Sequence, residues 1–372
     1  MLAIDATQLK GKYKGVLFVA TTLDGNNQIV LIAFGVGESE NNHSWKWFLD
    51  NLNFTLGYLP GLVILSDRHK GLMKEVPEVF QYATHGYCAY HIYRNLVDTF
   101  KDKSLETLYW QAVKTCRKAE FEKIMDNIKM ANPPVFAWLT EIGYERWASS
   151  HFPGKRFNFV TTNISECVNA LFKEAREYPV TRLIETVRLK IQEMFYKRSE
   201  RASTFSGPLT KWAAKEITEL IPMARDVRCH AISRDEYYTI GDYKDTLKLS
   251  ELSCTCREFD VKALPCIHVL SACIKYNLPH HKYCSPFYTV ENYRMCYNQP
   301  LYPVRDKSEW ELSDQFKEFC AKIKPPEVRR SAGRPKKMRI PSRGEERKTV
   351  KCGRCKQTSH NRRRCKFPIP EE

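Results

Sequence analysis

A short apolar run that stops on an acid constrains this chain more than any other feature of its sequence. Residues Leu62–Leu65 are aliphatic, follow Pro60-Gly61, and lead directly to Asp67 before the helix-like stretch Lys70–Val79. An aliphatic run of this length between turn signals is typical of a buried strand. The strand would carry Asp67 at its C-terminal edge, where the active sites of α/β sheets usually lie.

Two further acids have comparable placements. Asp5 ends the apolar opening Leu2-Ala3-Ile4, and Glu166 begins a helical stretch after Thr161–Ser165. Three separated carboxylates on strand ends and a helix start predict a site for two Mg²⁺ or Mn²⁺ ions and phosphoryl-transfer chemistry.

Each acid also has a purely structural alternative. Asp67 could cap the helix that follows it, and Asp5 could be a strand-end acid near a turn. Asn163 and Glu166 have the spacing of a capping box. The three acids together favour the metal site, because the fold outlined next brings these ends of the chain together.

Two β-rich runs follow the first strand. Val16–Leu23 and Gln28–Val36 are joined by Asp24–Asn27, which is a strong hairpin signal. With a first strand ending near residues 5–9, they predict three antiparallel strands. The periodic stretch His43–Leu56, with Ser44 as its expected cap, predicts a crossover helix to the Asp67 strand.

This order of elements is the start of an RNase-H-like fold, in which the first and fourth strands lie side by side. Asp5 would therefore lie beside Asp67. The predicted class is α/β, an RNase-H-like mixed sheet with an all-α insertion, followed by small zinc-binding modules. The predicted divisions are 1–200 for the RNase-H-like domain, with its insertion at about 104–160; 201–236 for a helical connector; 237–300 for a zinc module; 301–350 for a basic linker; and 351–366 for a second zinc module.

Four potential zinc ligands are closely spaced in the first predicted module. Cys254, Cys256, Cys266 and His268 form a C-x-C-x9-C-x-H pattern. Three thiolates and one imidazole make a tetrahedral set with no open position, which is typical of structural zinc. The pattern resembles a SWIM zinc finger, including Pro265 and the helical stretch that follows the last ligand.

A second pattern, C-x2-C-x4-H-x4-C, lies near the C-terminus at Cys352, Cys355, His360 and Cys365. A loop this short has no core of its own, so metal coordination would have to fold it. It resembles a CCHC zinc knuckle, a module that often binds single-stranded nucleic acid or protein. Two structural zinc ions per chain are therefore expected.

The positive charge is concentrated in the last part of the chain. Residues 324–372 hold 17 Lys and Arg against 5 Asp and Glu, which is +12 of the net +16. Such a tail suits a polyanion such as DNA, and the alternative is a solvated tail for solubility or nuclear import. Ser331–Lys337 resembles an AT-hook, although Ala332 stands where that motif usually has Arg. The expected DNA contacts are Arg334, Lys336, Lys337, Arg354, Arg362, Arg363 and Arg364.

Size and composition are those of a globular protein outside the secretory route. The chain has 372 residues, 43% of them hydrophobic, without an apolar run long enough to span a bilayer or the order of residues of a secretory signal. Fourteen cysteines in such a chain favour metal ligands and reduced thiols over disulfides. A cytosolic or nuclear location without a membrane partner is expected.

Several motifs of the N-terminal two-thirds resemble those of the Mutator-like (MULE) transposases of plants. The matching segments are Ile4–Tyr13, Asp24–Asn27, Ala33–Val36, Ser44–Leu49, Ser66–Leu72, Cys88–His91 and Thr162–Glu166. The resemblance implies that Asp5, Asp67 and Glu166 occupy the DDE positions and that Cys88 and His91 form the family's C-x-x-H pair. Two ligands are too few for a closed zinc site. The pair is therefore expected to support the metal ligands, contact DNA, or fill the core.

The resemblance implies a nuclear DNA transposase that self-associates and cuts and joins DNA phosphodiester bonds with two catalytic metal ions. The alternative is a domesticated, catalytically inactive relative that binds DNA or regulates transcription. Family members usually carry a DNA-binding region before the first acid, whereas only four residues precede Asp5 here. That difference favours the alternative.

Overall fold

The computed structural model describes residues 1–322, apart from Tyr13, Asn158, Arg305, Trp310 and Leu312, together with Cys352 and Cys355. The chain divides into two compact units, Met1–Val328 and Arg329–Glu372, and the elements below belong to the first. No helix in the described ranges is both long and apolar enough to span a bilayer.

A five-stranded mixed sheet lies at the N-terminal end of this unit. Its strands are β1 (Leu2–Gln8), β2 (Val16–Leu23), β3 (Ile29–Gly37), β4 (Val63–Ser66) and β5 (Thr84–Tyr87), in the order β3-β2-β1-β4-β5. β1 and β3 are antiparallel to β2, whereas β4 is parallel to both β1 and β5. The predicted α/β class, the mixed sheet and the adjacency of the first and fourth strands are confirmed.

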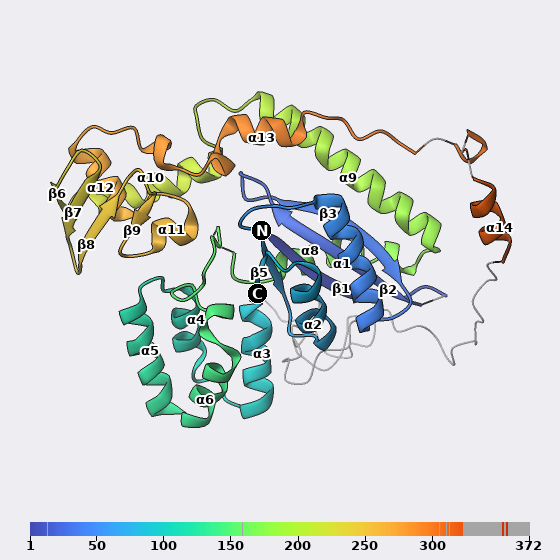
Figure 1. Ribbon diagram of the computed structural model, residues 1–372, viewed down its shortest axis with the longest axis horizontal. Helices are drawn as coiled ribbons and strands as arrows, with labels where there is room; N and C mark the ends of the chain where they lie inside the picture. Colours follow the sequence, from blue (N-terminus) through green and yellow to red (C-terminus); the bar gives the residue numbers. More distant parts are fainter. Residues whose placement is uncertain are drawn as a thin grey trace. The chain divides into compact units, whose positions relative to one another are not determined.

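Helices cover both faces of the sheet (Figure 1). α1 (Asn42–Leu56) and α2 (Lys70–Val79) pack against one face, and α8 (Asn163–Leu171) and α9 (Val180–Ser203) pack against the other. The sequence of β2 reflects this arrangement, because Val16, Phe18 and Ala20 enter the first core and Leu17 and Val19 enter the second. Burial on both sides explains why this strand is continuously apolar.

The start of α1 differs from the expectation. Asn41 is the N-cap, and its Oδ1 accepts a hydrogen bond from the Ser44 N–H at 2.9 Å. The expected cap, Ser44, therefore lies inside the helix, in its first turn. Asn and Ser cap helices about equally well, so the choice depends on where the chain leaves β3.

Between residues 104 and 160 the described residues form helices and no strand. After α3 (Ala89–Phe100) come α4 (Glu106–Lys114), α5 (Lys118–Ala131), α6 (Pro133–Ile142) and α7 (Tyr144–Trp147), which share one core with α3. Large aromatic side chains dominate it: the rings of Tyr109 and Trp147 stack at a centroid distance of 5.7 Å. These helices bury enough apolar surface among themselves to form a second packing centre beside the sheet (Figure 1).

A smaller α/β module follows α10 (Lys211–Asp226). We call it the Cys/His module. Its strands β6 (Arg228–Ala231), β7 (Glu236–Ile240), β8 (Lys244–Lys248) and β9 (Ser253–Cys254) form one antiparallel sheet, covered by α11 (Glu258–Lys262) and α12 (Ile267–Lys275). The sheet thus begins at Arg228, ahead of the expected start at Tyr237.

The chain then returns to the first sheet. After the short helices η2 (His280–Tyr283) and η3 (Pro286–Tyr288), α13 (Val290–Tyr297) packs against the end of α9. The Tyr297 hydroxyl donates to Asp24 Oδ2 at 2.7 Å, and Arg198 lies 3.4 Å from the same oxygen. Residues near 297, expected within the zinc module, therefore share a core with α9. η1 (Ala175–Glu177), η4 (Lys307–Glu309) and α14 (Asp314–Lys322) are the remaining helices of the described residues.

Candidate metal sites

Strand register brings Asp5 of β1 close to Asp67, the residue that follows β4. Ala3 of β1 pairs with Leu65 of parallel β4, and each acid lies two residues further along its own strand direction. Side chains two residues apart point to the same face. Asp5 therefore lies on the face of β1 that α8 covers, where Asn169 of α8 contacts it. Asp67 immediately follows the C-terminal end of β4, close enough for its charge to act on Asp5.

Glu166 reaches the same place from α8. Ser165, its neighbour, donates through Oγ to the Ala3 carbonyl oxygen at 3.2 Å, which holds the first turn of α8 on β1. The charges of both Asp67 and Glu166 act on Asp5 and raise its pKa. The structure thus brings the three predicted acids into one cluster.

Asp5 is partly buried, as are the other two acids. Burial, with smaller contributions from Asp67 and Glu166, raises its pKa to about 7 against the opposing effects of the Ala6 backbone N–H and His91. Asn169 Nδ2 donates to Asp5 Oδ2 at 2.8 Å. A buried carboxylate beside two others is the arrangement in which a divalent cation gains most, because it removes repulsion between the ligands.

The structure bears on the structural alternatives for Asp67 and Glu166. Asp67 Oδ1 accepts a hydrogen bond from the His69 N–H at 3.0 Å, but the imidazole of His69 itself caps α2. The capping-box hypothesis is wrong for Asn163 and Glu166, because Thr162 is the N-cap position and Asn163 is already the first helical residue. Glu166 is therefore one position too far along the helix for that motif.

Cys88 and His91 lie beside the acids rather than in a zinc site of their own. His91 Nε2 is 3.7 Å from Glu166 Oε1, and Cys88 Sγ accepts a hydrogen bond from the Thr162 N–H at 3.2 Å. Burial opposes a charge on His91, but its hydrogen bond with Cys88 and the nearby acids outweigh burial and raise its pKa to about 9. A protonated imidazole there partly offsets the negative charge of the cluster.

The carboxylate cluster is wider than a closed single-ion cage. Among the described residues, one group of His, Cys, Asp or Glu has three or more ligand atoms that all lie within 4.8 Å of one another. It is the Cys/His set described next. Asp5, Asp67 and Glu166 therefore do not form such a compact set of ligand atoms in this structure.

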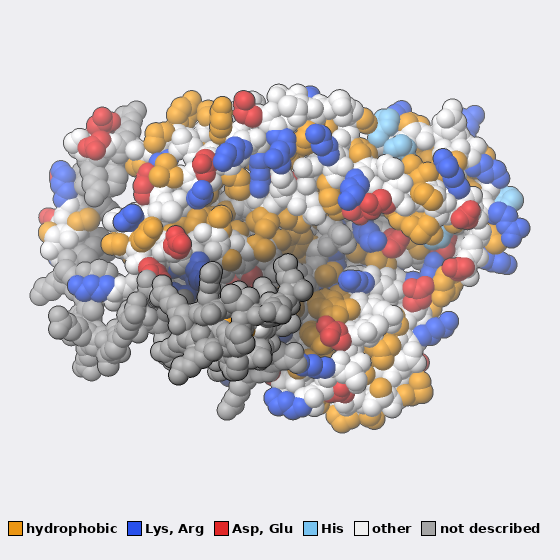
Figure 2. Space-filling view, turned by 180° about the vertical axis from the view of Figure 1, so that it is seen from behind, with side chains coloured by type: hydrophobic (Ala, Val, Ile, Leu, Met, Phe, Trp, Pro, Cys, Tyr) orange, Lys and Arg blue, Asp and Glu red, His pale blue; other side chains and the backbone are white. Residues whose placement is uncertain are grey.

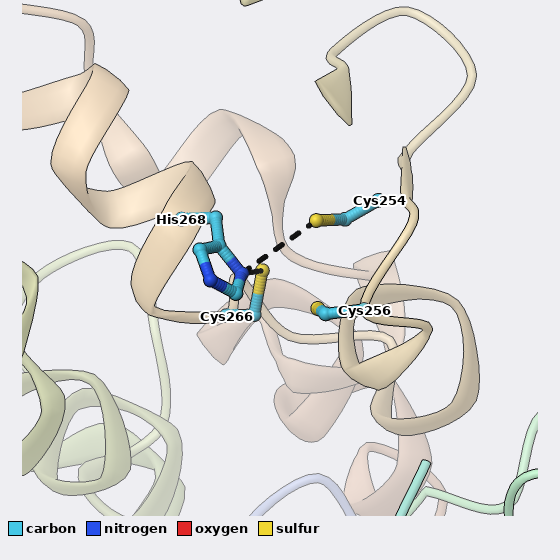
Figure 3. A group of neighbouring side chains, drawn as sticks. All are labelled: Cys254, Cys256, Cys266 and His268. Carbon is cyan, nitrogen blue, oxygen red and sulfur yellow. Dashed lines mark hydrogen bonds between the residues drawn. The ribbon is translucent and has the colours of Figure 1, made fainter. Parts of the chain in front are cut away.

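The four predicted ligands of the Cys/His module converge on one point (Figure 3). Cys254 ends β9, Cys256 follows it, and Cys266 and His268 flank the start of α12; all four are buried and their ligand atoms lie within 4.8 Å of one another. His268 Nδ1 is 3.7 Å from both Cys254 Sγ and Cys266 Sγ. Three sulfurs and one nitrogen in this compact set fit a zinc ion, with Nδ1 as the ligand atom.

The other imidazole nitrogen of His268 faces a buried acid. Asp245 Oδ2 lies 3.2 Å from His268 Nε2 and 2.7 Å from Arg117 Nη2, and Thr255 Oγ1 donates to Asp245 Oδ1 at 2.6 Å. A carboxylate on the distal nitrogen fixes the ring and strengthens its donor nitrogen toward zinc. Arg117 comes from the loop before α5, so this acid also joins the helical insertion to the zinc centre.

Removing the Arg117 guanidinium is expected to destabilise this junction. Arg117→Met keeps most of the aliphatic length but leaves the fully buried Asp245 without its cation, at a cost of about 3 kcal/mol in the free energy of unfolding. Chemical denaturation measures the change. Lys123→Met, at an exposed position on α5, is the matched control. Adding Asp245→Asn to Arg117→Met should recover part of the loss, and equal stability of Arg117→Met and wild type would contradict the assignment.

The second predicted zinc module is described only in part. Cys352 and Cys355 are buried. The other expected ligands, His360 and Cys365, lie outside the described residues, as do Arg334, Lys336, Lys337, Arg354 and Arg362–Arg364. The knuckle, the AT-hook-like segment and their DNA contacts therefore stay predictions.

Three residues of these sites were not found from the sequence. Asn169 follows Glu166 by three positions, which places it on the same side of a helix, and that spacing was an available signal. Asp245 lies in a polar stretch of an alternating strand, and Arg117 is a basic residue at the start of a charged helix. Neither has a local signal, because their importance comes from a contact across 128 residues of sequence.

Comparisons with known proteins match two parts of the chain. Residues 1–95 match the family model described as a MULE transposase domain, and residues 239–277 match the one described as a SWIM zinc finger. A search of curated proteins found no match. The first match contains Asp5, Asp67, Cys88 and His91, and the second contains all four ligands of the Cys/His module. Glu166 lies outside both, so its place at the site depends on the geometry.

Proposed function

We propose that this chain, which combines a MULE transposase domain with a SWIM zinc finger, cuts and joins DNA phosphodiester bonds at a two-metal site formed by Asp5, Asp67 and Glu166. The observation that supports the proposal is the pairing of β1 with parallel β4, which brings Asp5 close to the residue after β4, Asp67, while α8 with Glu166 is held on β1. We also assign the sheet to the RNase-H-like class on its strand order, β3-β2-β1-β4-β5.

In the proposed mechanism each residue has a separate task. Asp5 and Asp67 would be the ligands shared by both cations, and Glu166 would be a further ligand of one. The bound Mg²⁺ or Mn²⁺ ions would activate water, and then a DNA 3′-hydroxyl, for attack on a backbone phosphodiester, and would stabilise the leaving oxygen. His91, held by Cys88, lies against Glu166 and limits repulsion within the cluster when the cations are absent.

DNA is the expected partner of both matched domains. Figure 2 shows Lys and Arg side chains on one face of the molecule with Asp and Glu among them, rather than one uniformly basic surface. The larger excess of positive charge lies in residues 324–372, and we propose that this basic tail supplies most of the salt-dependent affinity. A nuclear location and self-association belong to the same proposal.

A strand-cleavage assay tests the proposed activity. The full chain, loaded with zinc, is incubated with end-labelled DNA in Mg²⁺ or Mn²⁺ and, in parallel, without either added cation. Cleavage that leaves 3′-hydroxyl ends and requires the added cation supports the proposal. DNA binding without any cation-dependent cleavage would instead support the alternative, a transposase-derived protein that binds DNA without catalysis.

The raised pKa of Asp5 predicts a pH dependence of cation binding. In the folded protein without the cation, Asp5 keeps a proton that the unfolded chain releases, so this group's contribution to stability is lost as pH rises from about 4 to about 7. Cation and proton compete for the same carboxylate. The rise in Tm caused by Mn²⁺ should therefore be larger at about pH 8 than at about pH 6, as measured by differential scanning fluorimetry.

Asp5→Asn is the control for this pH effect. Without Mn²⁺ at about pH 8 the variant should be at least as stable as wild type, because it removes an ionised group that Asp67 and Glu166 repel. With Mn²⁺ it should show little of the wild-type rise in Tm. Equal rises in Tm for wild type and variant would remove Asp5 from the metal site.

A further inference from the structure

Buried hydroxyl groups hold α8 on the sheet in one register. Ser165 Oγ donates to the Ala3 carbonyl oxygen at 3.2 Å and lies 2.7 Å from Thr21 Oγ1, and both hydroxyl side chains are fully buried. From this anchor, Asp5 is two residues further along β1 on the same face. One turn further along α8, at the position four residues after Ser165, the helix presents Asn169 to that carboxylate.

The contact between Asn169 and Asp5 is specific in direction. Asn169 Nδ2 donates to Asp5 Oδ2 at 2.8 Å, and the side chain is 8% exposed. Asn169 Oδ1 is buried without a hydrogen-bond partner among the residues that the structure describes. Turning the amide over would set Oδ1 against a carboxylate oxygen, so Asp5 dictates the orientation. A buried carbonyl oxygen without a hydrogen-bond partner costs about 1–3 kcal/mol of folding free energy. Stability alone would therefore not favour an asparagine at this position.

We propose that Asn169 is a positioning residue for divalent-cation binding. Its amide engages one oxygen of Asp5, which fixes the orientation of the carboxylate, and it ties Asp5 to the helix that carries Glu166. Because Glu166 precedes Asn169 by three residues on α8, a single helix supplies one ligand and the donor that orients another. The inference rests on the proposed function only in taking Asp5 and Glu166 as cation ligands.

The test measures cation binding and cleavage separately in the zinc-loaded full chain. Free Mn²⁺ is followed by electron paramagnetic resonance during titration, with Asp67→Asn defining the binding that belongs to this site. Asn169→Leu keeps the volume of the side chain and removes the donor. It should weaken Mn²⁺ binding about 10–100-fold, and excess Mn²⁺ should restore most of the cleavage rate.

Two variants on the same helix separate positioning from simple packing. Val168→Ala shortens a buried side chain of α8 that packs in the core on this face of the sheet, and should lower Tm while changing Mn²⁺ affinity less than about 3-fold. Cys167→Ala changes an exposed side chain of α8 and should change neither quantity. Asn169→Ser is measured beside Asn169→Leu, so that misfolding of one variant does not decide the result.

The outcomes distinguish this inference from the proposed function. Weakened Mn²⁺ binding in folded Asn169 variants supports it, even if the wild-type chain binds Mn²⁺ through Asp67 and cleaves no DNA, which would overturn the cleavage proposal alone. Wild-type Mn²⁺ affinity in a folded Asn169 variant overturns the inference while leaving cleavage intact. Misfolding of both variants, or absence of Asp67-dependent Mn²⁺ binding in wild type, also overturns it.

Discussion

Asp67→Asn should lower the rate of DNA strand cleavage by about 10³-fold without changing the fold or the zinc content. Loss of one anionic ligand from a two-metal site removes several kcal/mol of transition-state stabilisation, and about 4 kcal/mol corresponds to that factor. Initial rates of cleavage in Mn²⁺ at saturating DNA measure it.

The substitution isolates charge from shape. Asp67 Oδ1 accepts a hydrogen bond from the His69 N–H, and the amide oxygen of asparagine can accept the same bond. The turn into α2 should therefore persist, and the change that remains is the loss of negative charge beside Asp5 and Glu166. An unchanged Tm would confirm that the loss of activity is not a loss of structure.

Asp50→Asn is the matched control for a surface acid. Asp50 lies on α1 with an exposed side chain paired to Lys46 at 3.2 Å, so its loss should leave cleavage within about 2-fold of wild type. Full activity of Asp67→Asn would show that the observed cleavage comes from another site or from a contaminating nuclease, and the two-metal proposal would fail.

Cys266→Ser should remove one zinc ion per chain and unfold the Cys/His module. Structural zinc contributes about 10–16 kcal/mol to the folding of isolated zinc-finger peptides, which far exceeds what a core of this size can supply. Three of the ligands, Cys254, Cys256 and Cys266, are themselves members of the module's small hydrophobic core. Without zinc, three of the core positions would hold unligated thiols, which contribute less to the packing of the core than aliphatic side chains would.

Unfolding should extend beyond the module. Leu270 of α12 packs with Ala213 and Ile217 of α10, and the Asp245 carboxylate joins His268 to Arg117 in the helical insertion. Zinc analysis by mass spectrometry and hydrogen exchange of residues 228–276 measure the two effects. Hydrogen exchange in α10 should become faster together with exchange in residues 228–276. Exchange in β1 and β2 should stay slow.

Cys273→Ala provides the control within the same helix. Cys273 is buried in the module core but is not one of the four converging ligands, so the variant should keep its zinc and lose about 1 kcal/mol from a small cavity. Retention of zinc and of slow exchange in Cys266→Ser would show that the four-residue set does not hold the ion.

Elements with a strong local signal were predicted closely. The helix expected over Lys70–Val79 has those bounds, and the hairpin at Asp24–Asn27 joins β2 and β3. Boundaries set by tertiary packing were predicted less well. α9 continues to Ser203, past the boundary expected at residue 200 between the first domain and the connector, because Ala202 is buried against α13. No local pattern contains that contact.

The zinc site could be predicted from the sequence more completely than the site of the candidate acids. By itself, the sequence determined the identity and spacing of the four zinc ligands, because they lie within 15 residues and few folds can use such a pattern otherwise. It also placed Asp67 directly after a strand, but Asp5, expected at a strand end, lies in the middle of β1, which continues to Gln8. Only the tertiary structure decided that Asp5 and Asp67 lie close together, that Glu166 joins them, and that Asn169 and Asp245 orient their neighbours. Strand register and helix docking depend on contacts between residues far apart in the chain, and those contacts exist only once the two faces of the sheet are covered.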